Sequence, residues 1–479
     1  MIRRAVTFID ERSGSASLVR KALRYAFPDH WSFLLGEVAL YAFVVLVATG
    51  VYLTLFFEPS TAKTIYHGSY APLHGMKMSK AYASAISLSF DVKAGLLIRQ
   101  THHWAADVFV AAIVIHLIRV FFTGAYRKPR ELTYVIGVLL LFTVLLEGYL
   151  GYSMVDDLLS GMGLAIGYGV ALSIPFLGAN LALAIWGHPF PGDPDFWSRM
   201  YIAHVLIFPV LIGGLLGAHL ALVASRHHTQ FKPKRIDGER KLIGVPSFPG
   251  QAPRSLGLLL AVAAVLVLLG GLVQINPIWL WGPYHVGSAT NGAQPDWYLG
   301  WLIGALRLMP SFDLVIANRT LVPNPFWGGI LFPLVVMLAL LAWPWLERRV
   351  RGDRATHNVL DRPRDAPVRT AIGAGFLTWV ALIFMAGASD RVLVFLNVSY
   401  ASQIDFYRVA VWVAPVLVGL LAWRLCLGLK AKEAVEHDRD DAVRSARLAP
   451  PPAGSYPSRA GIGAAPPRES SAGRTKRRE

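Results

Sequence analysis

The sequence predicts an all-α polytopic membrane protein with about eight transmembrane helices, and three observations support this fold class. Of the 479 residues, 54% are hydrophobic and only 16% are charged. The mean hydropathy is +0.46. Apolar segments close to the roughly 20 residues that cross a bilayer recur along the chain, at residues 33–57, 104–124, 133–153, 199–224, 255–275, 326–346, 369–389 and 404–427.

The positions of the basic residues predict how these segments are oriented. Lys and Arg gather before residue 33 and in the loops that follow 104–124, 199–224 and 326–346, whereas none lies between Glu131 and Ser198. Loops rich in Lys and Arg stay on the cytoplasmic side, so both termini are expected there. A further apolar stretch at 158–187 is broken by Pro175. A ninth span there would reverse the later basic loops, so we expect it to lie along the membrane interface.

Charge and cysteine content exclude several classes of function. The net charge of +16 comes from loops and the tail, a placement that indicates membrane topology and no nucleic-acid partner. The single cysteine, Cys426, excludes an internal disulfide. It also excludes a CxxCH haem attachment and a cysteine-ligated iron–sulfur cluster within this chain.

Four histidines lie at matched depths in two of the expected helices. His102 and His116 are 14 residues apart, and His204 and His219 are 15 apart. Four helical turns take about 14.4 residues, so each pair lies near one helix face with about 21 Å between its members. Neutral imidazole is a common iron ligand, and two imidazoles fill both axial positions of a haem. The pattern therefore predicts two non-covalent, bis-histidine b haems stacked across the membrane.

Paired glycines repeat the same spacing in two other expected helices. Gly36 and Gly50 are 14 residues apart, as are Gly137 and Gly151. Small residues at these depths would let a helix backbone approach a flat macrocycle, although glycine pairs in membrane helices also serve packing alone. Four helices, within residues 33–228, would then form a dihaem bundle.

Three arginines lie close to the histidines along the chain. Arg99 precedes His102 by three residues, Arg119 follows His116 by three, and Arg199 precedes His204 by five. Each is a candidate partner for a haem propionate. The alternative is that these side chains extend to the membrane interface, as arginines near helix ends usually do.

Three further polar residues in the apolar segments have open roles. His103 and Asp107 are four residues apart, so they could form a local hydrogen-bonded pair or a proton relay. Glu147 lies one turn before Gly151. A carboxylate inside a membrane indicates function by default, but the sequence assigns Glu147 no role.

Over about residues 30 to 430 the chain resembles the cytochrome b subunits of quinol–cytochrome c reductases. The histidines, glycines and arginines match, and QPDWY at 294–298 is similar to the PEWY motif that lines the outer quinol site. GYSMVDDLLSG at 151–161 falls where that family has interfacial helices. INPIWLWGPYH at 275–285 looks most like the actinobacterial, menaquinol-oxidising branch.

The resemblance implies a role for each matched residue. His102 and His204 would hold a low-potential haem near the outer face, and His116 and His219 a high-potential haem near the cytoplasm. The catalytic residues of the outer menaquinol site would be Asp296, Tyr298 and Tyr152.

The same resemblance implies a reaction and partners. One electron would pass to a Rieske iron–sulfur protein and the other through both haems to a quinone on the cytoplasmic side, with proton translocation across a bacterial cell membrane. A c-type cytochrome subunit, a terminal oxidase contact, the lipid membrane and a dimer are the expected partners. The implied division is a cytoplasmic segment at 1–32, the dihaem bundle at 33–228, a C-terminal four-helix region at 229–430 with PDWY, and a disordered cytoplasmic tail at 431–479.

Three departures from the family pattern leave questions for the structure. Asp296 replaces a glutamate that is one methylene longer, and it could merely cap the following helix. The 15-residue spacing rotates His219 by about 100°, which local helix geometry must compensate. Val155-Asp156 replaces Pro-Trp beside Tyr152.

The inner quinone site is weakly defined. Its candidates are Ser225, His227, His228 and Asp237, and a basic, lipid-facing loop explains each of them equally well. Two other functions stay open. A dihaem membrane anchor of another dehydrogenase would lack the quinol motif, and a proton-coupled transporter would often show internal repeats.

Overall fold

Eight membrane-spanning helices are present in the computed structural model, which describes residues 8, 10–12, 14, 23–232, 242–290 and 295–448. Each is long and apolar enough to cross a bilayer, which confirms the predicted fold class. They are α3 (Leu35–Thr54), α5 (Gly95–Thr123), α6 (Glu131–Ser153), α9 to α10 (Pro194–Arg226), α11 (Ala252–Leu272), α13 (Phe332–Arg351), α14 (Pro367–Gly387) and α16 (Tyr400–Leu448).

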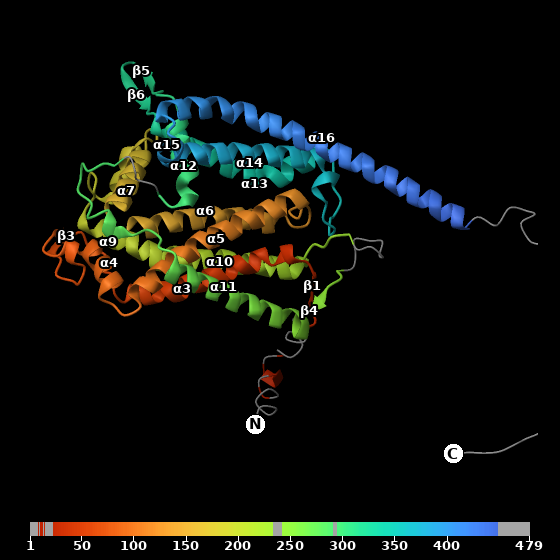
Figure 1. Ribbon diagram of the computed structural model, residues 1–479, viewed down its shortest axis with the longest axis horizontal. Helices are drawn as coiled ribbons and strands as arrows, with labels where there is room; N and C mark the ends of the chain where they lie inside the picture. Colours follow the sequence, from red (N-terminus) through yellow and green to blue (C-terminus); the bar gives the residue numbers. More distant parts are fainter. Residues whose placement is uncertain are drawn as a thin grey trace, which may run out of the picture. The chain divides into compact units, whose positions relative to one another are not determined.

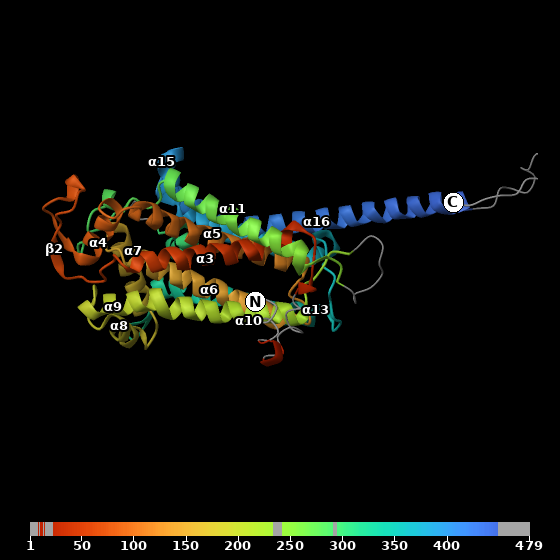
Figure 2. The same cartoon turned by 90° about the horizontal axis from the view of Figure 1, so that it is seen from below.

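The first four spans pack as two helix pairs. α3 packs along α5, and α6 packs along α10, while α11 covers α3 and α5. Figures 1 and 2 show these helices side by side, with nearly parallel axes. A second group is built around α12 (Gly300–Leu308), which packs against α14, and it joins the first where α13 contacts α6.

Shorter elements gather at the two ends of the bundle (Figure 1). One end, here called the β2–β3 end, carries β2 (Lys63–Ile65), β3 (Lys77–Ser79), α4 (Lys80–Phe90), α7 (Leu158–Leu172) and α8 (Gly178–Trp186). The opposite β1–β4 end carries the antiparallel pair β1 (Ala26–Phe27) and β4 (Val245–Pro246). The hairpin β5 (Leu314–Ile316) and β6 (Arg319–Val322), and α15 (Ser389–Leu396), lie on the α7 side of the bundle, away from β1 and β4 (Figure 1).

The ambiguous apolar stretch at 158–187 forms two short helices. α7 has 15 residues and α8 has nine, both below the length that crosses a bilayer. Asp157 begins α7 with a capping box, in which its side chain accepts from Leu159 N and its backbone N–H donates to Ser160 Oγ. Pro175 lies in the break, where it has no backbone N–H to continue a helix. The stretch is therefore not a ninth span.

The span that carries His204 and His219 contains a π-helical turn. α9 (Pro194–Ile202) leads into a π turn at Ala203–Ile207 before α10 (Phe208–Arg226), and Phe208 N–H bonds to Ala203 O. A π turn takes in one extra residue, and this one includes His204 and ends before His219. It absorbs the rotation of about 100° that the 15-residue spacing would otherwise impose.

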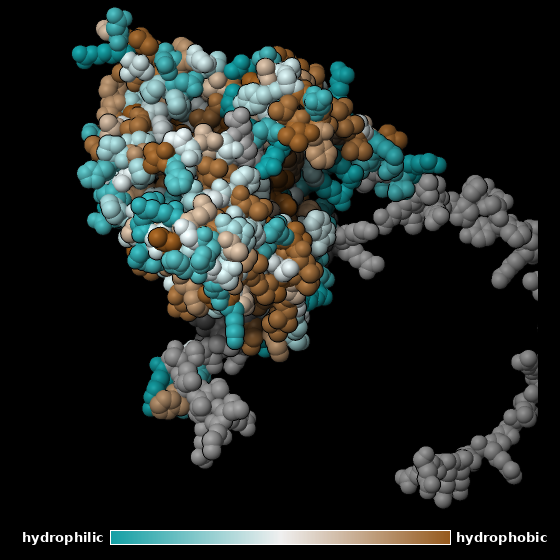
Figure 3. Space-filling model, turned by 60° about the vertical axis from the view of Figure 1, so that its left-hand side comes forward, coloured by the Kyte–Doolittle hydropathy of each residue, from teal (hydrophilic) through white to brown (hydrophobic). Residues whose placement is uncertain are grey.

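The helix surfaces are apolar where lipid would contact them. Large side chains such as Val51, Val210 and Leu260 are more than half exposed in the isolated chain. Figure 3 shows brown apolar patches among the polar residues on one face. Exposed apolar area on this scale marks a membrane or protein contact. The chain is a multi-pass membrane protein.

The end of the chain differs from expectation. The chain divides into two units, 1–427 and 428–479. In the second unit the helix runs through Leu448, so residues 431–448 are helical where a disordered tail was predicted. This segment is rich in Ala, Glu and Arg, which favour helix, and it includes an i,i+4 ion pair between Lys432 and Glu436. Residues 449–479 lie outside the described residues.

Candidate functional site

Two pairs of histidines face each other across the first helix bundle. His102 on α5 and His204 on the π turn form the first pair, with ring centroids 6.4 Å apart and planes at 79°. His116 and His219 form the second pair, one bundle depth further toward the β1–β4 end, and they lie close enough to interact electrostatically. The structure therefore brings together the four histidines that the sequence singled out.

Each of the four predicted glycines lies against a different histidine. A Cβ built on Gly50 would lie 3.3 Å from His102 Cε1, and one on Gly36 would lie 3.5 Å from His116 Cε1. On the other helix pair, a Cβ on Gly151 would lie 2.5 Å from His204 Cε1. The corresponding distance from Gly137 to His219 Cε1 is 3.4 Å. Because glycine has no side chain, each of these positions leaves room for the imidazole ring that packs against it.

The first pair has the separation of two axial ligands on one metal ion. A metal–imidazole bond is about 2 Å long, so two such bonds plus the half-widths of two rings span about 6 Å. Among the described residues no group of three or more His, Cys, Asp or Glu could hold a metal. Two histidines alone suit a metal whose other ligands come from a cofactor, as they do in haem. The donor set therefore fits a b-type haem.

The Nδ1 atoms of the histidines have different partners at the two depths. In the first pair, His102 Nδ1 lies 2.9 Å from Thr49 Oγ1, and His204 Nδ1 lies 3.0 Å from Glu147 Oε1. In the second pair, neither Nδ1 meets hydrogen-bond geometry with a described residue, although the Thr133 backbone lies beside His219. The Nε2 atoms of the first pair are thus left for a metal.

The three candidate arginines have different surroundings. Arg99 donates to Asn276 O from both terminal nitrogens at 3.3 Å, and its buried Nε has no partner among the described residues. Arg119 stacks on the ring of Phe33 at 4.2 Å, and its Nε and Nη2 are likewise unpartnered in the described part. Arg199, half exposed, is paired with Asp193 at 3.1 Å. Only the first two have buried N–H groups without a described acceptor.

Asp296 forms the centre of a hydrogen-bonded network beside the first pair. Its Oδ1 lies 2.7 Å from His103 Nε2, and its Oδ2 accepts from the Tyr298 hydroxyl at 2.9 Å. Both carboxylate oxygens are therefore engaged, and the side chain makes no capping bond to the helix that follows. The helix-cap interpretation of Asp296 is wrong. Burial and the neighbouring Asp296 carboxylate raise the pKa of Tyr298 well above its ordinary value.

Of the two alternatives for His103 and Asp107, the local hydrogen-bonded pair is not formed. His103 bonds to Asp296, 193 residues away in the sequence, while Asp107 Oδ1 is buried without a described partner. Spacing along one helix suggested the wrong acceptor. The long-range partner left no local signal apart from the PDWY motif itself.

Tyr152 and Tyr298 lie near the end of α6, close enough to interact electrostatically. A Cβ on Gly148 would lie 2.5 Å from Tyr298 Oη, and Tyr152 lies one turn further along the same helix, 8% exposed. Because Gly148 follows Glu147, the partner of His204, the Asp296 network adjoins the first histidine pair. The three residues predicted for the quinol site are therefore neighbours.

Asp156, where the family pattern has Trp, occupies a buried position with a left-handed backbone. Its φ is +62° and it is 6% exposed, and its backbone O accepts from Tyr284 N. Burial raises the pKa of Asp156 to about 6, against the opposing effects of Ser79 and Lys63. Sequence reasoning did not identify this carboxyl as a titrating group.

At the β1–β4 end, the candidate residues for the inner quinone site have different surroundings. His228 Nδ1 lies 3.1 Å from the Tyr25 hydroxyl, and burial, together with Arg119 and Arg130, lowers the pKa of His228 to about 4. His227 stacks on Tyr25 with centroids 5.3 Å apart. Ser225 is exposed and bonds only to its own helix. Asp237 lies outside the described residues.

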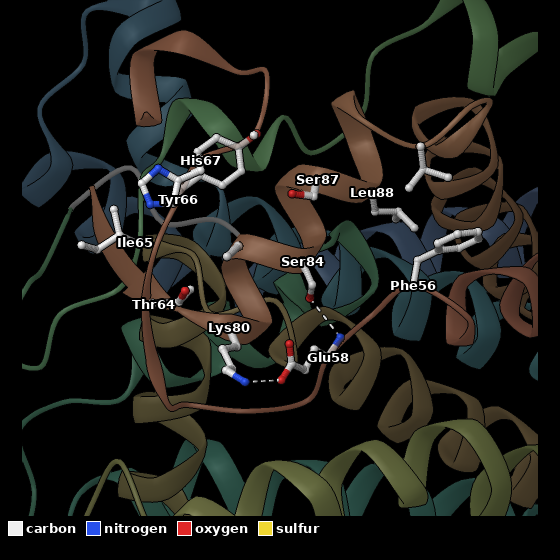
Figure 4. Close-up of a pocket in the computed structure, with 13 residues that line it drawn as sticks. Phe56, Glu58, Thr64, Ile65, Tyr66, His67, Lys80, Ser84, Ser87 and Leu88 are labelled. Atoms are coloured by element: carbon white, nitrogen blue, oxygen red, sulfur yellow. Dashed lines mark hydrogen bonds and ion pairs between the residues drawn. The ribbon is translucent and has the colours of Figure 1, made fainter. Parts of the chain in front are cut away.

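A groove of about 570 Å³, lined in part by His67, opens at the β2–β3 end, and none of the four paired histidines lines it (Figure 4). Glu58 crosses its floor, bonded to Lys80 Nζ at 2.7 Å, with its backbone N–H donating to Ser84 Oγ. None of the residues predicted for the site lines this groove.

Known proteins resemble the chain along most of its length. A family model described as "Cytochrome b(N-terminal)/b6/petB" matches residues 107–283, which include His116, His204 and His219. The cytochrome bc1 complex cytochrome b subunit of Streptomyces coelicolor is 44% identical over 443 residues, covering 92% of this chain and 81% of that protein. The subunit of the same name from Corynebacterium diphtheriae is 45% identical, covering 91% and 80%.

A third relative and a solved structure agree with these matches. The cytochrome bc1 complex cytochrome b subunit of Mycobacterium tuberculosis (strain H37Rv) is 44% identical, with 91% of this chain and 79% of that protein covered. A chain of a solved structure titled "Hyperthermophilic respiratory Complex III" superposes with a TM-score of 0.64 at 20% identity, over 87% of this chain and 99% of that one. At that identity the structural match supports the fold alone.

Proposed function

Because the chain belongs to the cytochrome b subunits of cytochrome bc1 complexes, and so to a quinol–cytochrome c reductase, we propose that its four paired histidines hold two b haems. His102 and His204 would hold one, and His116 and His219 the other. When bound, the haems carry single electrons between the two depths of the bundle. Membership of this family argues against the two alternatives, a proton-coupled transporter and a dihaem anchor of another dehydrogenase.

One observation carries the proposal: four glycines from two helices each face a different one of the four histidines. Their Cβ positions would lie 2.5 to 3.5 Å from the four Cε1 atoms. Packing alone requires small residues at close helix contacts, but it does not require an imidazole opposite every one. The 6.4 Å between His102 and His204 adds a separation suited to two axial ligands.

Beside the first pair, we propose that quinol is oxidised at the Asp296 network, which would position it and take up a proton. Asp296 would accept a proton from the quinol hydroxyl, because a carboxylate within hydrogen-bond reach of a substrate proton is a suitable general base. His103 holds Oδ1 and Tyr298 holds Oδ2, so the carboxylate is oriented before substrate binds. Tyr152 would complete the wall of the site. A Rieske iron–sulfur partner would take one of the two quinol electrons, and the haem that His102 and His204 would hold would take the other.

We place this site on the outer face and the β1–β4 end at the cytoplasm, in accord with the basic loops. Quinone would be reduced near His228 and Tyr25, where Arg119 and Arg130 supply positive charge. Proton release outside and uptake inside would then build a proton gradient. Menaquinol as substrate, a c-type cytochrome subunit, a terminal oxidase contact and a dimer are proposed from the resemblance to the actinobacterial branch.

A reduced-minus-oxidised spectrum of the purified complex tests the cofactor proposal. Two b haems per chain are expected, and His102→Leu should remove one while His116→Leu removes the other. His74→Leu is a matched control, since His74 lies on the β2–β3 loop against His67, and it should keep both. Retention of both haems in the His102 and His116 variants would sink the assignment.

A further inference from the structure

Glu147 is a carboxylate inside α6 that the proposed chemistry leaves without a role. Its Oε1 lies 3.0 Å from His204 Nδ1, and its own backbone O lies 3.3 Å from the same nitrogen. The side chains of His204 and Glu147 are 17% and 15% exposed. Glu147 Oε2 is buried with no hydrogen-bond partner in the described part of the chain. Among the described residues, His204 is therefore the hydrogen-bond partner of the Glu147 carboxylate.

The other three histidines have no such partner among the described residues. His102 Nδ1 meets the hydroxyl of Thr49, whose proton is directed to Val45 O at 2.7 Å. His116 and His219 have no side-chain partner at Nδ1 in the described ranges. One of four otherwise similar imidazoles thus bonds to a carboxylate, and it belongs to the first pair.

A carboxylate in this position changes the electronic character of a metal-bound imidazole. It accepts the Nδ1–H hydrogen bond, fixes the tautomer and makes Nε2 a stronger donor. A stronger donor favours the oxidised, more positively charged iron, and hydrogen bonding beyond the ligands is one of the means by which a protein sets a haem potential. A negative charge in a partly buried, low-dielectric position acts in the same direction.

We propose that Glu147 is a positioning residue that lowers the reduction potential of the haem held by His102 and His204 relative to the haem held by His116 and His219. This inference rests on the proposed function, since it needs both haems. It makes the hydrogen bond between Glu147 and His204 one contributor to the potential difference between the two depths. The same contact holds the ring of His204, which lies on the π turn, with its centroid 6.4 Å from that of His102.

Potentiometric titration of the purified complex, followed by haem absorbance, tests this inference. Glu147→Leu should shift the oxidised-to-reduced ratio of the first haem at fixed potential at least tenfold toward reduced, which is about 59 mV for a one-electron couple. Glu147→Gln keeps an acceptor oxygen without the charge and should shift it less. The second haem serves as an internal reference and should not move. Thr143→Val, one turn away on α6 and bonded only to Leu139 O, is the matched control.

The outcomes separate this inference from the proposed function. Absence of two b haems in the parent complex would overturn the proposed function. Two haems in both Glu147 variants, with both potentials unchanged, would overturn the inference alone. If Glu147→Leu loses the first haem, Glu147→Gln decides: an unchanged potential leaves Glu147 a structural clamp and overturns the inference, whereas a raised potential supports it.

Discussion

The two ends of the helix bundle present similar histidines in opposite electrostatic surroundings. At the β2–β3 end, carboxylates hold the site: Glu147 bonds His204, and Asp296 bonds His103 and Tyr298. At the β1–β4 end, the charged groups near His228 are the guanidinium groups of Arg119 and Arg130. The fold thus places carboxylates, together with Arg99, beside the first histidine pair, and Arg119 and Arg130 near His228 at the other end.

This difference indicates how one protein chain can make two chemically similar cofactors unequal. Buried negative charge favours the oxidised form of a metal centre and accepts protons, whereas buried positive charge favours the reduced form and attracts anionic groups. An electron would therefore move from the β2–β3 end toward the β1–β4 end. The side chains around the proposed ligands would set the direction of electron transfer, because the proposed ligands are histidines at both depths.

Substitutions of the glycines beside the histidines should have the largest effects, and they compare the two depths of the bundle directly. Gly151→Ala should remove most of the first haem, since the new Cβ would lie 2.5 Å from His204 Cε1, closer than two carbon atoms can approach. Gly36→Ala, with 3.5 Å to His116 Cε1, should retain both haems. The haem-to-protein ratio measures the effect. Equal losses in the two variants would contradict an unequal fit at the two depths.

Asp296→Asn should have the next largest effect. The amide cannot take the proton, so quinol-dependent turnover should fall by about 100-fold, within the range of general-base contributions. Haem content should not change. Asp405→Asn, an exposed aspartate paired with Arg408, is the control and should keep full turnover. Normal turnover in Asp296→Asn would leave this carboxylate a structural partner of His103 and Tyr298.

The stability of the two ends should respond to pH in opposite ways. Burial raises the pKa of Asp156 from 3.8 to about 6, so its stabilising contribution is present below pH 4 and is lost as pH rises through 6. Asp156→Asn should therefore stabilise the protein at pH 7.5 by roughly 3 kcal/mol, because each pH unit between the two pKa values corresponds to about 1.4 kcal/mol. At pH 4.5 the gain should be much smaller. Thermal unfolding in detergent at both pH values measures it.

His228 provides the opposite case. Its pKa is lowered to about 4, so its contribution is present above pH 6.5 and is lost as pH falls through 4. His228→Asn should therefore lessen acid destabilisation, by a smaller amount because His228 keeps some contact with solvent. The same pH trend in both variants would contradict the electrostatic contrast between the ends.

The sequence was sufficient for features that repeat along one helix, and insufficient for contacts between helices. The eight spans follow from hydropathy, and the spacing of His102 and His116 places them on one face of α5. Even the π turn was foreshadowed by the extra residue between His204 and His219. The partners of His103 and His204 lie 193 and 57 residues away, and only tertiary packing brings them close. Local spacing therefore offered a pair between His103 and Asp107 and a helix-cap alternative for Asp296, and neither side-chain contact is formed.

Thr49 provides the smallest and most discriminating test of the comparison. Its hydroxyl oxygen is the acceptor nearest His102 Nδ1, at 2.9 Å, but it is neutral, and a neutral hydrogen bond contributes only about 1 kcal/mol net. Thr49→Val should raise the potential of the first haem by clearly less than Glu147→Leu and leave the second unchanged. The same redox titration measures both. A Thr49 effect as large as that of Glu147 would mean that any hydrogen bond at Nδ1 suffices, so that the charge of the carboxylate does not set the difference between the two depths.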